Sequence, residues 1–176
     1  AEFVLTLILA VRFWAVDGIG LGTALWRGLF HAVSAFNNAG FALFSTNMID
    51  YALDPVIILT LSLAVIAGGL GFPVWLELHS RWRLPDRWSL HTKITLAATG
   101  VLLLVGWVAM TLLEWNNEAT LGSMPVHGKI LNGFFASVVP RTAGFNSIDY
   151  GEMQPEGLLI TNMLMFAGGG SGSTAG

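Results

Sequence analysis

Two short stretches of the sequence combine a glycine with backbone groups that could bind a cation. Residues 34–41 read SAFNNAGF and residues 137–145 read SVVPRTAGF, so Ala-Gly-Phe occurs twice, with Gly40 and Gly144 separated by 104 positions. A helix that ends at such a break leaves its last carbonyl groups without intrahelical partners, and these carry partial negative charge. Glycine permits the positive φ angles that a turn after the helix requires. The pattern favours two short strands whose carbonyl oxygens replace part of the hydration shell of a cation, as in potassium filters.

The residues before each glycine are mostly small, which lets one backbone approach another. Phe41 and Phe145 are expected to pack behind the two strands and anchor them. Taken singly, each break also fits a glycine that caps the end of a helix, whereas two copies within one larger pattern favour the filter. The expected filter residues, with K+ as the only bound metal ion, are Asn37, Asn38, Ala39, Gly40, Arg141, Thr142, Ala143 and Gly144.

The composition indicates a membrane protein. Of the 176 residues, 54% are hydrophobic and 11% are charged, whereas a typical soluble domain has about 25% charged residues. The absence of cysteine excludes disulfide bonds, a thiol nucleophile and a cysteine-ligated zinc ion. The formal net charge is −3 with 8 basic residues, too few for binding to nucleic acid. Because the chain lacks a signal-peptide pattern and stops just after an apolar run, we expect a fragment of a longer protein.

Four long apolar segments are candidates for membrane-spanning helices, since a span needs about 20 predominantly apolar residues. Uncharged windows cover residues 57–76, 94–113 and 157–176, although the end of the third is nearly all Gly, Ser and Thr. Residues 3–16 resemble the end of a fourth span, interrupted only by Arg12. These windows predict an all-α, multi-pass protein of the lipid bilayer.

Two further apolar runs, residues 25–36 and 130–139, are too short to span a bilayer. Runs of this length are core, re-entrant or interfacial segments. An amphipathic surface helix is the alternative, although neither run has a convincing charged face. Each run leads directly into an Ala-Gly-Phe break, which favours a short re-entrant helix.

The charged residues predict the orientation in the membrane. By the positive-inside rule, the basic connection at residues 79–93 lies in the cytoplasm, and the remaining loops, which carry most acidic residues, face the exterior. A negative outer vestibule would concentrate cations; alternatively, the acids merely avoid the inner face. The basic residues are Arg81, Arg83, Arg87 and Lys93, and the acidic ones are Asp17, Asp50, Asp54, Glu114, Glu118, Asp149, Glu152 and Glu156.

These segments occur twice in the same order: a span, a short re-entrant helix, an Ala-Gly-Phe break, an acidic linker and a second span. The first copy covers residues 1–80 and the second residues 92–176, with a cytoplasmic loop at 81–91. Internal repeats are frequent in membrane transport proteins. The sequence therefore predicts about two span–pore loop–span units.

Four motifs carry a resemblance to a known family. They are HAVSAFNNAGFALF (31–44), IAGGLGFPV (66–74), SVVPRTAGFNSIDY (137–150) and MFAGGGSGSTAG (165–176). In this order they resemble the Trk/Ktr/HKT superfamily of potassium uptake proteins, most closely its KtrB-type (TrkH-like) membrane subunits. The resemblance implies four linked repeats around one pore, each giving one filter strand with one key glycine. This chain resembles the second repeat and most of the third, which would supply two of the four walls.

The resemblance also assigns the end of the chain to an intramembrane loop that acts as a gate below the filter. A flexible linker is the plainer alternative. One departure from the family is Gly170, where a serine is expected, and the equivalent residues 71–73 of the first copy are expected only to kink or tighten their span. The gate-loop residues are Gly168, Gly169, Gly170, Ser171, Gly172, Ser173 and Thr174.

The partners and ions follow from the resemblance alone. It implies a homodimer of pore subunits in the cell membrane, with a cytoplasmic ring of nucleotide-binding regulatory domains. K+ is the expected transported ion, Na+ a candidate coupling or activating ion, and no cofactor is expected. The family also has an arginine at the position of Arg141, which implies a structural role. Its guanidinium is expected to point behind the filter, because a charge aimed into the pore would repel the ion.

Two other functions compete with a potassium pore. A secondary cation carrier would have a closed site at the middle of the membrane. An intramembrane hydrolase would use Ser171 or Ser173 as a nucleophile, but the sequence offers no general base near that loop. The four histidines (His31, His79, His91 and His127) are scattered, so we expect neither a zinc site nor an enzyme.

Overall fold

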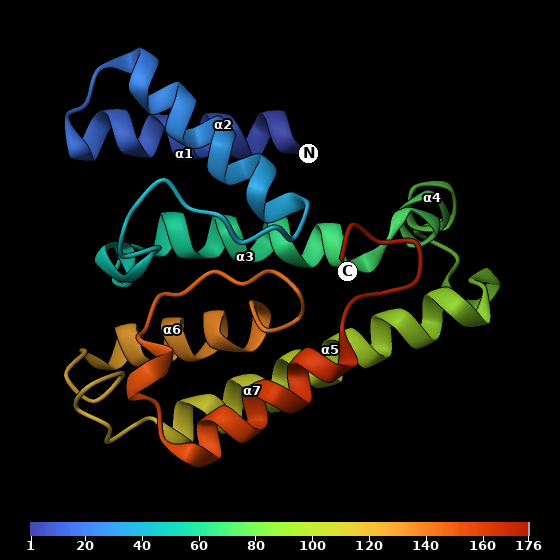
Figure 1. Cartoon of the computed structure of the whole chain (residues 1–176). Helices are drawn as coiled ribbons and strands as arrows, with labels where there is room; N and C mark the ends of the chain where they lie inside the picture. Colours follow the sequence, from blue (N-terminus) through green and yellow to red (C-terminus); the bar gives the residue numbers. More distant parts are fainter. Residues whose placement is uncertain (176) are drawn as a thin grey trace.

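The chain folds into helices joined by turns and loops (Figure 1). The computed structural model describes residues 1–175, and no β-strand occurs among them, so the predicted all-α class is confirmed. The α-helices are α1 (Glu2–Asp17), α2 (Leu21–Phe36), α3 (Pro55–Leu70), α4 (Phe72–Arg81), α5 (Leu90–Leu113), α6 (Val126–Val138) and α7 (Pro155–Ala167). Three short 3-10 helices are η1 (Ile49–Tyr51), η2 (Pro85–Arg87) and η3 (Tyr150–Glu152).

Two groups of helices repeat one order along the chain. The first group is α1, α2 and α3, and the second is α5, α6 and α7, with η1 or η3 just before the third helix of each. In Figure 1, α3 and α6 lie next to each other across the middle, with α1 and α2 above them and α5 and α7 below. The predicted span–pore loop–span units, with boundaries at residues 80 and 92, remain a prediction.

The two groups share one apolar core. Phe13 of α1, Leu61 of α3 and Phe135 of α6 are fully buried in the same cluster. Close helix contact is made possible by small residues: a Cβ built on Gly28 of α2 would lie 2.7 Å from the carbonyl oxygen of Thr6 in α1. Lipid provides little hydrophobic force between helices, so such glycine contacts are a main source of helix association in a membrane.

The apolar segment at residues 57–76 is not one span. α3 ends at Leu70 and α4 begins at Phe72, with an angle of 95° between them. The expected kink is therefore a sharp turn. Gly71 has a φ of +90°, which favours glycine, and Pro73 has no N–H to continue the helix. The N–H of Phe72 instead donates to the carbonyl oxygen of Gly172 at 3.1 Å, so a distant part of the chain completes the turn.

One helix, α5, is long and apolar enough to cross a membrane by itself, and the bent pair of α3 and α4 would be a second if it counted as one span. α1, with 16 residues, contains the whole window at 3–16, whereas α7, with 13 residues, is shorter than the window at 157–176. One face of α5 is covered with exposed apolar side chains, including Val101, Leu104 and Leu112, which are 59–69% exposed. Such a surface fits lipid better than water.

A polar network at one end of the molecule fixes α1 to α3. Arg12 forms ion pairs with Asp17, at 2.8 Å, and with Asp54. The Asp54 carboxylate also accepts hydrogen bonds from the N–H groups of Val56 and Ile57, so it caps the N-terminus of α3. The Tyr51 hydroxyl donates to Asp17 at 2.8 Å, and burial followed by this hydrogen bond raises the pKa of Tyr51 to about 12. Tyr51 is therefore a neutral donor throughout the physiological pH range.

Replacing Asp54 should loosen this end of the molecule. Asp54→Ala removes both the helix cap and one ion pair, and we expect it to lower the free energy of unfolding by about 2 kcal/mol. The matched control is Asp50→Ala, because Asp50 is exposed and accepts only the Thr46 hydroxyl. Thermal unfolding of the purified protein in detergent measures both. Equal melting temperatures for the two variants would contradict the role of Asp54.

Candidate cation-binding site

Two glycine turns follow the short helices α2 and α6. We name residues 37–40 the first glycine turn and residues 141–144 the second glycine turn. The N–H of Ala39 donates to the carbonyl oxygen of Ser34 at 2.8 Å, and the N–H of Gly144 donates to that of Val139 at 3.1 Å. Each turn is thus tied to the last turn of its helix, where carbonyl groups lack regular intrahelical partners.

Both turns have left-handed residues at the same two positions. The φ angle is +51° at Asn38 and +71° at Gly40, and it is +73° at Thr142 and +74° at Gly144. For the branched Thr142 this conformation costs about 1–2 kcal/mol. In a regular strand, the backbone alternates from one residue to the next, so successive carbonyl groups point to opposite sides. Left-handed residues at alternate positions break this alternation and let neighbouring carbonyl groups point to the same side. A strained backbone repeated in two copies favours a functional role.

The two glycine turns meet backbone to backbone. A Cβ built on Gly144 would have the Cα of Gly40 as its nearest neighbour, at 3.9 Å. A Cβ built on Gly40 would overlap the carbonyl oxygen of Ala143. Position 40 therefore accepts only glycine, whereas position 144 has room for a side chain.

Asn38 is the side chain that joins the two turns. It is 7% exposed, and its Nδ2 donates to the carbonyl oxygen of Arg141 and to the Thr142 hydroxyl, both at 3.3 Å. The neighbouring Asn37 is exposed and donates instead to the Glu2 carboxylate at 2.9 Å. Asn37 therefore fixes α2 to α1, and Asn38 fixes one glycine turn to the other.

A cavity of about 490 Å³ lies beside the turns. Ala39 lines it from the first glycine turn, Thr142 and Gly144 line it from the second, and Met165 lines it from α7. Within residues 1–175, no three histidine, aspartate or glutamate side chains come together as metal ligands do. A cation bound in this cavity would depend on backbone carbonyl groups and water, the ligands that suit K+.

The guanidinium of Arg141 reaches the end of α7 and the side of α5. Its Nε donates to the carbonyl oxygen of Gly168 at 3.1 Å, and its Nη2 donates to the Thr99 hydroxyl of α5 at 3.2 Å. The carbonyl group of Arg141, expected to face the ion, accepts the amide of Asn38.

The glycine-rich loop, defined as residues 168–174, packs on the turn between α3 and α4 (Figure 1). The N–H of Gly170 donates to the carbonyl oxygen of Gly69 at 2.8 Å, and the N–H of Thr174 donates to that of Gly68 at 3.3 Å. The Thr174 hydroxyl also donates to the carbonyl oxygen of Phe36, the last residue of α2, at 2.9 Å. The predicted gate residues therefore lie directly beside the first glycine turn.

A comparison with known protein families matches residues 2–176 to TrkH, described as a cation transport protein. The chain belongs to the TrkH family. The resemblance to the Trk/Ktr/HKT superfamily is therefore confirmed, and the family, together with the apolar surface of α5, identifies a membrane protein.

Relatives of this TrkH-family chain include two potassium uptake proteins. The chain is 41% identical, over 99% of its length, to the Ktr system potassium uptake protein B of Bacillus subtilis (strain 168), and 47% identical, over 92% of its length, to that of Vibrio alginolyticus. It spans 38% and 36% of these two relatives. The crystal structure of the potassium transporter TrkH from Vibrio parahaemolyticus has the same fold, with a TM-score of 0.70 at 20% identity, over 98% of this chain and 35% of that one.

One positioning residue of the TrkH-family chain was missed at the level of sequence. The Nε2 of His31 accepts the N–H of Leu43 at 3.2 Å, so its Nδ1 carries the proton and donates to the carbonyl oxygen of Arg27 at 2.7 Å. The ring is 1% exposed and stacks on Phe44 at 4.9 Å. His31 thus holds the segment that leaves the first glycine turn, and no local signal distinguishes it from Arg27 and Ser34, the other polar residues of the same run.

The two phenylalanines after the glycines differ. Phe145 is fully buried in the core, as expected for an anchor, whereas Phe41 is 70% exposed. The expectation for Phe41 is wrong, because its side chain lies at the surface of the described residues and not in the core. Phe41 instead lines an apolar groove along α2 with Trp26 and Phe30.

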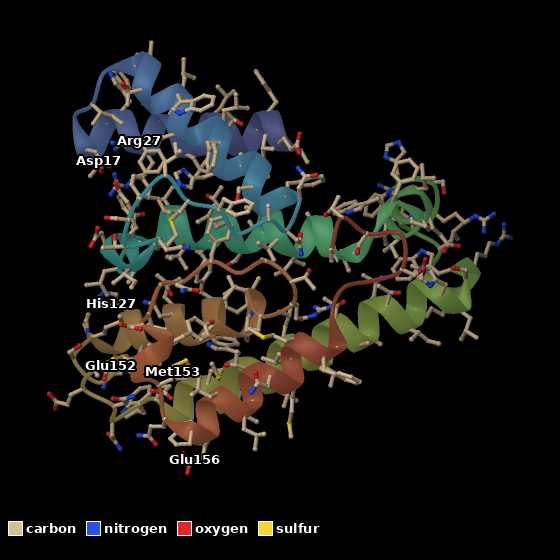
Figure 2. All side chains as sticks on the ribbon, viewed as in Figure 1. Asp17, Arg27, His127, Glu152, Met153 and Glu156 are labelled. Carbon is tan, nitrogen blue, oxygen red and sulfur yellow. The ribbon has the colours of Figure 1, made fainter. Side chains whose placement is uncertain are left out.

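Three of the acidic residues expected on the exterior lie at one end of the molecule, but not every acidic residue of that group is exposed. Asp17, Glu152 and Glu156 lie at the end opposite α4 (Figure 2). Glu114, which was expected to face the exterior, is fully buried. Its carboxylate accepts hydrogen bonds from the Thr120 hydroxyl at 2.7 Å and from the N–H of Gln154 at 3.0 Å, next to the N-terminus of α7. Glu114 therefore joins α5 to α7 and adds little to an outer vestibule.

The two glycines should differ in their tolerance of a methyl group. Gly40→Ala places a Cβ against the Ala143 carbonyl as well as straining the backbone, whereas Gly144→Ala adds only the strain, about 1–2 kcal/mol. We expect Gly144→Ala to yield folded protein with a modestly lower melting temperature, and Gly40→Ala to yield little. Size-exclusion chromatography and thermal unfolding measure this, and equal losses would contradict the contact between the turns.

Proposed function

We propose that this chain forms two of the four walls of a K+-selective pore in a potassium uptake protein of the cell membrane. The observation that carries the proposal is the pair of glycine turns, which share the same left-handed positions and meet at Gly40 and Gly144. The filter consists of residues 37–40 and 141–144, whose carbonyl groups replace water around the ion. The two Ktr relatives, named as potassium uptake proteins, support the choice of ion.

The glycine-rich loop acts as the gate in this proposal. It is held next to the first glycine turn by hydrogen bonds to residues 68, 69 and 36. Gly and Ser form helices poorly, so this segment can leave its position at low cost. K+ enters the cell down its electrochemical gradient, since a membrane potential contributes about 2.3 kcal/mol per charge per 100 mV.

The partners are proposals that rest on the family. We infer a homodimer of pore subunits with a cytoplasmic ring of nucleotide-binding regulatory domains, and a role for Na+ as a coupling or activating ion. The basic stretch after α4 lies at the end of the molecule opposite the acidic residues in Figure 1 and Figure 2, which supports its position in the cytoplasm.

A serine hydrolase finds no support near the loop. Among the described residues, neither Ser171 nor Ser173 forms a hydrogen bond with a histidine or a carboxylate, and Ser173 instead accepts the N–H of Ala175 at 3.2 Å. A nucleophilic serine requires a base within reach.

Gly144→Ser is the sharper test of the filter, because position 144 has room for a side chain. In the full-length protein, expressed in a bacterium that lacks its own K+ uptake, we expect the K+ concentration for half-maximal Rb+ uptake to rise about tenfold, a loss of ~1.4 kcal/mol of ion binding. We also expect Na+ to compete more strongly, because a hydroxyl beside the carbonyl groups changes their spacing.

The matched control is Gly100→Ser. Gly100 lies in α5, and a Cβ there meets no atom within 4 Å. Its uptake should equal that of the parent. If Gly144→Ser and Gly100→Ser both behave like the parent, the glycine turns are helix caps and the filter proposal fails. Single-channel current steps in a planar bilayer would separate a pore from a secondary carrier.

A further inference from the structure

We propose that Arg141 is a positioning residue whose side chain holds the glycine-rich loop in place and so connects the second wall of the filter to the gate. This inference rests on the proposed function. It assigns a role to a guanidinium that the ion does not touch, and it makes the position of the gate depend on the conformation of the filter.

Arg141 belongs to both structures at once. Its backbone is part of the second glycine turn, where its carbonyl oxygen accepts the amide of Asn38. Its side chain reaches the first residue of the glycine-rich loop, since Nε lies 3.1 Å from the carbonyl oxygen of Gly168. A second contact, from Nη2 to the Thr99 hydroxyl at 3.2 Å, fixes the plane of the guanidinium against α5. A movement of the second glycine turn therefore displaces the glycine-rich loop, and a movement of the loop displaces the turn.

The positive charge of Arg141 is partnered by a carbonyl group of the glycine-rich loop. Within residues 1–175, no carboxylate lies within ion-pair distance of its guanidinium. The guanidinium lies instead at the C-terminus of α7, where Gly168 is the capping residue. The carbonyl groups at a helix C-terminus carry partial negative charge, and a cation removed from water requires such a partner. Displacing the loop would leave the arginine without its main acceptor.

Gly168 is shaped for this contact. Its φ of 59° and ψ of −155° fall in a region that only glycine occupies readily. This conformation ends α7 and directs the chain into the glycine-rich loop while its carbonyl oxygen accepts from Arg141. A Cβ at position 168 would strain the backbone and misdirect the acceptor.

The space around the contact leaves little freedom. The cavity bounded by Asn38, Gly69, Arg141 and Gly169 measures only about 10 Å³. Filter, α3 and loop residues therefore lie close together around the partly buried side chain of Arg141. The loop leaves its position only when the contact between Arg141 and Gly168 breaks.

The test measures how easily the loop leaves this position. Ser173 is half-buried against the turn between α3 and α4 and the chain contains no cysteine, so Ser173→Cys provides one partly shielded reporter thiol in a full-length protein whose other cysteines have been replaced. We expect Arg141→Gln to raise its rate of reaction with a water-soluble maleimide about tenfold, the loss expected for one charged hydrogen bond. Gly168→Ala should act similarly, and the double variant should add little, because both changes remove the same contact.

Two further variants serve as controls. Arg27→Gln removes the same charge from α2, where the guanidinium lies over the Phe44 ring at 5.2 Å, and it should leave the thiol rate unchanged. Thr99→Val keeps Arg141 but removes its contact with α5, and it should raise the rate by a smaller factor of about three. This variant decides the question if Arg141→Gln does not fold: an increase supports the proposal and an unchanged rate overturns it.

Uptake separates this inference from the proposed function. Releasing the gate should raise the maximal rate of Rb+ uptake more than it changes the half-saturating concentration, whereas Gly144→Ser should change mainly the latter. An unchanged thiol rate in Arg141→Gln, or strictly additive effects with Gly168→Ala, overturns the role of Arg141 even if Gly144→Ser weakens K+ uptake. If Gly144→Ser has no effect while the thiol rates respond, the filter proposal fails. Arg141 then still holds the glycine-rich loop, but it does not connect that loop to a filter.

Discussion

The contact between the two glycine turns is the constraint on which the rest of the structure depends. Gly40 approaches the Ala143 carbonyl so closely that no other residue fits, and Asn38 spans the same junction with its amide. The helices α2 and α6 must therefore end at matching depths, and α3 must lie between them to fill the core. Further along, the N–H of Met48 donates to the carbonyl oxygen of Asn146 at 2.9 Å, so the chains leaving the two turns stay joined.

Irregular backbone inside a membrane protein requires internal partners. Two such segments, the turn between α3 and α4 and the glycine-rich loop, provide them for each other. The hydrogen bond from Phe72 to Gly172 runs in one direction and the bond from Gly170 to Gly69 in the other. The 95° bend and the loop are thus one feature built from both repeats. A segment held by a few backbone bonds and one arginine is suited to movement, because each contact contributes only modestly.

Much of this arrangement could be predicted from residue types and spacing. Apolar windows located most of the helices, although the window at 57–76 did not separate α3 from α4. The repeated Ala-Gly-Phe located both glycine turns, because glycine is favoured where φ is positive and required where backbones touch. The roles of His31, Asn38 and Glu114 could not be predicted, since a buried polar residue has no local signature and its partners lie 12, 103 and 40 positions away. The expectation for Phe41 was wrong because the repeated motif suggests the same burial in both copies, whereas the fold buries Phe145 and leaves Phe41 exposed.

The sequence by itself determined that this chain is helical, apolar and repeated, and that glycines stand at the two breaks after the short helices. These properties follow from hydropathy and from the conformations that glycine alone adopts. Only the tertiary structure decided that the two breaks touch, that the span after the first one bends sharply, and that Arg141 reaches Gly168 rather than a carboxylate. Those outcomes depend on which groups meet across 27 to 104 positions of chain, where packing and hydrogen-bond satisfaction select the partners.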